Sequence, residues 1–123
     1  RGGQKSKRMI YLLIFISGVA KAIIDTLQFH YDSSVFSGLN SSFWNPNVSW
    51  VNQHKTWLPA FTTDGWHLFQ SIFLTTLFAS IVLYKPIFNY HEIDAIRMIA
   101  DFIILRGVFG FGFVLFYNKL LLK

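Results

Sequence analysis

Asp64 and His67 are the side chains best placed to do chemistry, because an acid and an imidazole stand three residues apart at the start of a long apolar run. If a helix begins at Asp64, both side chains face the same side of its first turn. Carboxylate and imidazole groups bind zinc and similar divalent cations. Together with His30, which follows the preceding apolar run, they form a candidate metal site. This interpretation predicts a divalent metal such as zinc as a cofactor.

A structural interpretation of the same stretch competes with the metal site, and we favour it. An Asp before an apolar run is typical of a helix N-terminus, where its carboxylate accepts hydrogen bonds from free backbone N–H groups. The polar residues around Asp64 would then tie the helices to the loop that precedes them. The stretch contains no H-E-x-x-H or G-x-S-x-G motif, so catalytic residues stay unassigned.

Three apolar segments must position these side chains, at about residues 9–29, 65–84 and 93–118. Hydrophobic residues make up 53% of the 123-residue chain, and 14% are charged, against about 25% in ordinary globular proteins. About 20 apolar residues of helix cross a bilayer. The pattern predicts an all-α integral membrane protein, with residues 1–123 as a single transmembrane domain. A secretory signal peptide with a cleavage site at residues 18–20 is the alternative for the first segment.

Polar residues interrupt the apolar segments, and we expect them to form one intramembrane cluster. Charged groups at membrane depth usually face protein or a polar cavity rather than lipid. Counting about 1.5 Å per residue places Arg106 with Asp25 in the outer leaflet and Asp101 nearer the middle. A ligand or lipid-headgroup pocket with Lys21 and Arg106 as its cations is an alternative. The expected cluster is Lys21, Asp25, Gln28, Gln70, Asp101 and Arg106.

Residues 30–64 form a long outer loop that is rich in aromatic residues. All four Trp residues of the chain lie between positions 44 and 66. Trp prefers the membrane–water interface, where its ring is shielded and its N–H stays hydrated. We therefore expect the loop to fold back onto the membrane surface and cover the ends of the helices.

The third apolar segment carries Gly107, Gly110 and Gly112. Glycines in an apolar run without a preceding strand do not form a phosphate-binding loop. They favour close helix packing or a kink. Two forms of this segment stay open: one long tilted helix, or a helix that breaks near Arg106 and Gly107.

The distribution of basic residues predicts the orientation. Arg1, Lys5, Lys7 and Arg8 precede the first segment and Lys85 follows the second, which places both on the cytoplasmic side by the positive-inside rule. The net charge of +5 then reflects contact with anionic membrane lipid, and we expect no nucleic-acid partner.

Two segments of the loop resemble those of a known group of proteins. Residues 43–50, FWNPNVSW, and residues 63–67, TDGWH, are similar to motifs in small uncharacterised membrane proteins of Bacteroidetes-like bacteria. The resemblance covers roughly residues 20–85. It implies a bacterial origin and a membrane location, and it implies no chemistry.

These patterns predict a non-enzymatic subunit or accessory protein of the bacterial cytoplasmic (inner) membrane, with its N-terminus in the cytoplasm. The expected partners are lipid and either further copies of the chain or a larger membrane complex. One alternative is a metal-binding protein or metal-dependent membrane hydrolase with its site at the outer face. The other is ligand or ion transport by an oligomer.

Overall fold

The computed structural model describes residues 2–84 and 95–121, and most of this part of the chain is helical. Its three long helices are α1 (Gly2–Phe29), α4 (Gly65–Val82) and α5 (Ala95–Leu115). The described residues contain no β-strand, which confirms the expected all-α class.

Three helical segments are long and apolar enough to cross a membrane: Arg8–Phe29, Gly65–Val82 and Met98–Asn118. The predicted three segments are thus confirmed, with ends shifted by a few residues. Two sequence predictions lie outside the described residues. These are the start of the third segment, at residues 93 and 94, and Lys85 as a cytoplasmic marker.

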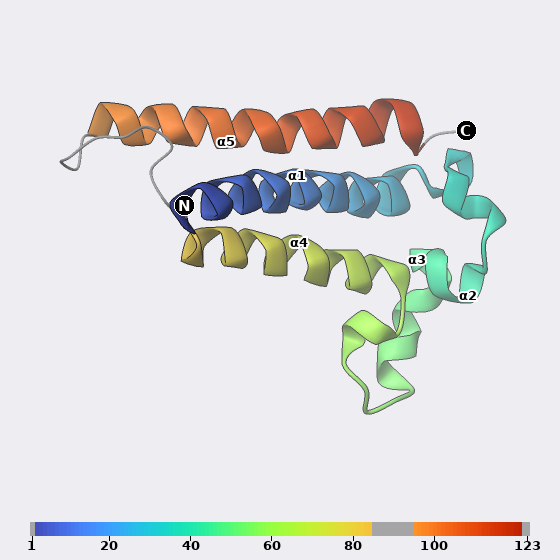
Figure 1. Ribbon diagram of the computed structural model, residues 1–123. Coiled ribbons are helices and arrows are strands. Elements are labelled where there is room, and N and C mark those ends of the chain that lie inside the picture. The colour runs from blue at the N-terminus through green and yellow to red at the C-terminus, as the bar shows by residue number, and fades with distance from the viewer. Residues whose placement is uncertain (1, 85–94, 122–123) are drawn as a thin grey trace.

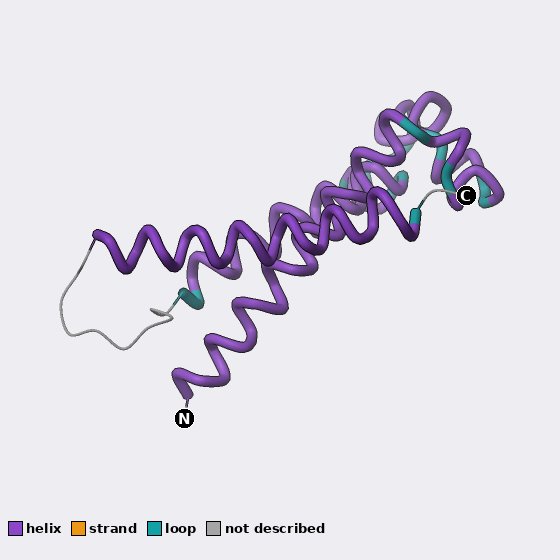
Figure 2. The backbone as a smooth tube through the Cα atoms, turned by 90° about the horizontal axis from the view of Figure 1, so that it is seen from above, coloured by secondary structure: helices purple, strands orange, loops and turns teal. Residues whose placement is uncertain are grey.

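Helix α1 is the central element of the fold. It lies between α4 and α5, antiparallel to α4 and parallel to α5 (Figure 1). Of the residues in its apolar segment 56% are buried within the protein, against 11% for the segments of α4 and of α5. Seen from above, the three helices converge toward the loop, and the N-terminal half of α1 diverges from the others (Figure 2). Helices α4 and α5 therefore leave most of their apolar surface uncovered.

Two glycines let α1 and α5 approach closely. A Cβ at Gly18 would collide with the backbone carbonyl of Phe109, and a Cβ at Gly112 would lie 2.9 Å from the carbonyl oxygen of Phe15. Small residues at helix interfaces are typical of membrane proteins, where backbone contact replaces the hydrophobic driving force. Helix α5 runs without interruption past Gly107, so the alternative in which the third segment breaks there is wrong. Of the three predicted glycines, Gly112 serves close packing, whereas a Cβ at Gly107 would meet nothing within 4 Å.

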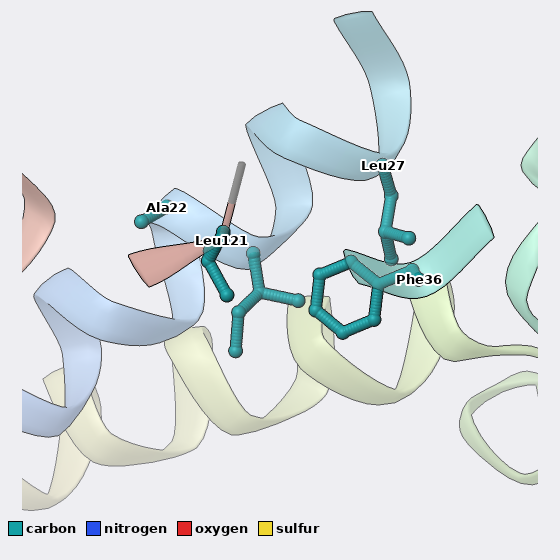
Figure 3. Close-up of a cluster of buried hydrophobic side chains, with 5 residues drawn as sticks. Ala22, Leu27, Phe36 and Leu121 are labelled. Carbon is teal, nitrogen blue, oxygen red and sulfur yellow. The ribbon is translucent and has the colours of Figure 1, made fainter. Parts of the chain in front are cut away.

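The buried apolar core lies at the loop end of the helices. Ala22 and Leu27 of α1 meet Phe36 from the loop and Leu121 from the end of the chain (Figure 3). The backbone N–H of Val35 donates to the carbonyl oxygen of Leu121 over 2.9 Å. These contacts join the start of the loop to the C-terminal end of α5.

The loop is a chain of short helical turns. Asn45 caps α3 by accepting a hydrogen bond from the backbone N–H of Asn47. Trp44 stacks on Phe36 with ring centroids 5.0 Å apart and also contacts Phe69 of α4. The loop therefore packs on the ends of α1 and α4. Its turns are η1 (Tyr31–Ser33), η2 (Val35–Gly38), α2 (Ser41–Trp44), α3 (Pro46–Ser49), η3 (Trp50–His54) and η4 (Ala60–Thr62), and a π-helical turn, η5 (Phe116–Leu120), follows α5.

Candidate functional site

Asp64 is a buried carboxylate that joins the loop to the start of α4. Its side chain is 1% exposed. The oxygen Oδ1 accepts from the backbone N–H of His67 over 2.9 Å, as a helix N-cap does. The oxygen Oδ2 accepts from the hydroxyl of Ser49, 3.0 Å away in α3. Both oxygens are therefore engaged by the fold.

The imidazole of His67 also contacts Asp64, with Nδ1 2.7 Å from Oδ1. When Nδ1 carries the proton it donates to this carboxylate, which leaves Nε2 as an acceptor. The His67 side chain is 25% exposed. Chemically, this arrangement offers one oriented basic nitrogen, in the way that carboxylates orient histidine ligands.

The three residues do not form a nucleophile–base arrangement. A triad requires the serine hydroxyl to bond to the imidazole. Here Ser49 and His67 bond to different oxygens of Asp64, so the carboxylate lies between them. The geometry is that of a structural network, as the favoured sequence interpretation predicts.

His30 does not join Asp64 and His67. It lies at the end of α1, with its ring 5.5 Å from the ring of Tyr117. It lines a small polar hollow at the loop end of the helices together with Asp32. Within residues 2–84 and 95–121, no three His, Cys, Asp or Glu side chains are grouped as metal ligands. The predicted three-residue zinc site is therefore not assembled, because Asp64 faces its own helix and α3 while His30 packs beside the end of α5.

The expected intramembrane cluster is divided among separate places. Lys21 and Asp25 form an ion pair at 3.0 Å on α1, as their spacing predicts. The hydroxyl of Tyr84 donates to Asp101 over 2.6 Å. This bond places Asp101 level with the end of α4, because the first turns of α5 extend beyond α4 (Figure 1). Of the remaining members, Gln28 is exposed at the C-terminal end of α1 and Gln70 is half-buried on α4.

Arg106 is an exposed cation within the apolar segment of α5. Its guanidinium carbon lies 5.4 Å from the centroid of the Phe109 ring. A Cβ at Gly110 would lie 3.2 Å from Nη1, so the side chain extends toward the C-terminal end of the helix. The sequence predicted that Arg106 would lie beside Asp25, and the structure does not place them together.

Arg106 lines an apolar groove between α4 and α5. Ile14 of α1 contributes to the lining between the two helices, and the volume is about 410 Å³. A second groove of about 300 Å³ shares Ile14 with the first and continues to Tyr84. The other residues of the first groove are Phe73, Leu77, Phe102, Leu105 and Phe109. This groove could not be predicted from the sequence, because apolar residues that line a groove are of the same types as residues that face lipid.

Comparisons with protein-family models, with curated proteins and with solved structures find no match to this chain.

Proposed function

We propose that the chain is a small non-enzymatic subunit or accessory component of a membrane assembly, and that it associates through the groove between α4 and α5. The assembly would lie in the bacterial cytoplasmic membrane, with the start of α1 on the cytoplasmic side. The observation that carries this proposal is the position of Arg106, an exposed cation on a groove that opens from the face of two membrane-length helices.

The distribution of burial supports association within the membrane plane. α1 already has neighbours on two sides, whereas α4 and α5 present apolar surfaces such as Phe78 and Phe102, exposed by 63% and 66%. Lipid accepts apolar surface, but a cation at membrane depth favours a protein partner. The described part of the chain therefore has a well-packed centre and an incomplete polar contact at its edge.

The alternatives receive less support. Transport requires an enclosed path, and the groove on this chain is open to one side. Metal-dependent hydrolysis requires several converging ligands, and within residues 2–84 and 95–121 no three His, Cys, Asp or Glu side chains converge. An oligomer remains compatible with the proposal, since further copies are one kind of partner.

Native mass spectrometry of the chain extracted from its own membranes tests the proposal. We expect a complex larger than one copy of the chain. Leu77→Trp places a large ring in the groove and should reduce that complex, whereas Phe78→Trp changes the neighbouring exposed position and should not. A single copy carrying only lipid would contradict the proposal, and so would equal complex formation by the two variants.

A further inference from the structure

We propose that the groove between α4 and α5 receives a membrane-spanning helix of a different protein, and that this helix carries a carboxylate near its middle that pairs with Arg106. The inference rests on the proposed function and specifies the chemistry of the partner.

Charge complementarity is the first step. Within the described residues Arg106 has no ion pair, and its contact with Phe109 leaves the charge uncancelled. Arginine binds carboxylate and phosphate groups through two parallel N–H donors. The occupant of the groove should therefore carry an acidic group beside its apolar surface.

The depth of the guanidinium decides between the two kinds of acidic group. Arg106 lies five residues after Asp101, which bonds to Tyr84 at the end of α4, so its Cα is about 7–8 Å further along α5, within a core of about 30 Å. Its side chain then extends toward Gly110, further from the inner end. Phosphates of lipids lie at the surface of the bilayer, out of reach of this guanidinium. A carboxylate on a spanning helix can lie at the same depth.

A second copy of the chain does not supply that carboxylate. The three apolar segments contain two acids, Asp25 and Asp101. Asp25 is paired with Lys21 at 3.0 Å. Asp101 is 1% exposed and accepts the hydroxyl of Tyr84. Both acids are engaged within their own copy, so the partner is a different protein.

The shape of the groove fits side chains of a helix that lies along it. The two connected hollows extend from Phe73 to Tyr84 over Ile14, which is roughly three turns of α4. Side chains that repeat every three or four residues on a partner helix would enter the hollows in succession. One acidic position on the same face then meets Arg106.

Association with designed membrane-spanning peptides tests the inference. The full chain and a Leu/Ala peptide with one central Glu are labelled for energy transfer in phosphatidylcholine vesicles. Matched peptides carry Gln or Leu at the same position. We expect the Glu peptide to bind about tenfold more tightly than the Leu peptide, the strength typical of one polar contact between helices. Arg106→Leu should remove this preference, Arg106→Lys should keep part of it, and Lys55→Leu in the exposed loop should leave it unchanged.

Several results would overturn the inference while leaving the proposed function standing. One is equal binding of the Glu and Leu peptides, and another is a Glu preference that survives in a folded Arg106→Leu variant. Loss of the preference when phosphatidylglycerol is added would assign Arg106 to lipid phosphate. Energy transfer between two labelled copies that depends on Arg106 would assign the groove to a second copy. Circular dichroism of each variant establishes that it is folded.

Discussion

The guanidinium of Arg106 lies 5.4 Å from the centroid of the Phe109 ring, on the side of α5 that faces the groove. A cation–π contact of this kind contributes about 0.5–2 kcal/mol, which is less than a charge loses on leaving water. The ring therefore positions the side chain without neutralising it. This residual charge is what distinguishes the groove from the apolar surfaces that face lipid.

The packing of α1 on α5 predicts opposite effects for two glycine substitutions. Gly18→Ala would force its methyl group against the carbonyl of Phe109 and should lower the free energy of unfolding by about 1–3 kcal/mol. Gly107→Ala has nothing within 4 Å of the new methyl group and should be neutral or stabilising by up to about 1 kcal/mol. Thermal unfolding in mild detergent compares them. A Gly18→Ala variant as stable as Gly107→Ala would show that the helices do not pack as described.

The N-cap of α4 predicts that Asp64→Ala destabilises the protein. The substitution removes the acceptor of the His67 backbone N–H at the start of α4 and also the acceptor of the Ser49 hydroxyl. The free energy of unfolding should therefore fall by about 2 kcal/mol. Asp64→Asn keeps an oxygen acceptor at the cap and should lose less. Asp32→Ala, at an exposed loop position, is the matched control. Chemical denaturation of the three variants measures the differences, and equal stability of Asp64→Ala and Asp32→Ala would refute the structural role.

The bond between Tyr84 and Asp101 predicts a loss of stability in Tyr84→Phe. The hydroxyl donates over 2.6 Å to a carboxylate that is 1% exposed, and a hydrogen bond to a charged group contributes about 1.5–3 kcal/mol. Tyr11→Phe removes a hydroxyl from α1, where no hydrogen bond to a described residue is present, and should change stability little. Limited proteolysis should cut Tyr84→Phe faster than Tyr11→Phe. The same rate for both would contradict this contact between α4 and α5.

The separation of His30 from Asp64 and His67 predicts that the purified chain holds less than one zinc per molecule. Structural zinc sites use four protein ligands, whereas two side chains meet here. Elemental analysis of the native chain and of His67→Ala should give the same low zinc content. One zinc per chain that disappears in His67→Ala would restore the metal-binding alternative.

The helices and the N-cap could be predicted from sequence because their signals are local. Each apolar segment is long enough to cross a bilayer, and Asp64 directly precedes one of them. The pairing of Asp64 with Ser49 could not be predicted, since the two residues are fifteen positions apart in a loop of short turns. The path of this loop is set by tertiary contacts, such as those of Trp44 with Phe36 and α4, and no periodic pattern in the sequence indicates them.

The sequence also could not predict which helix lies in the centre, or how the helices are shifted along one another. The three segments are similarly apolar, so nothing local indicates that α1 lies in the centre. A depth count assumes a common starting level for the helices. The bond from Tyr84 to Asp101 shows that α5 begins beyond the end of α4, which shifts Arg106 away from Asp25.

Photo-cross-linking from two adjacent positions of α5 tests the central claim most directly. Phe102 lines the groove and Ile103 does not, and the two are 66% and 62% exposed at nearly the same depth. With benzoylphenylalanine at each position in the native membrane, we expect position 102 to give one discrete protein adduct. Mass spectrometry should identify in it a spanning helix with a central acid, and position 103 should give lipid adducts. Lipid adducts alone from both positions, or the same protein adduct from both, would contradict a partner bound in the groove.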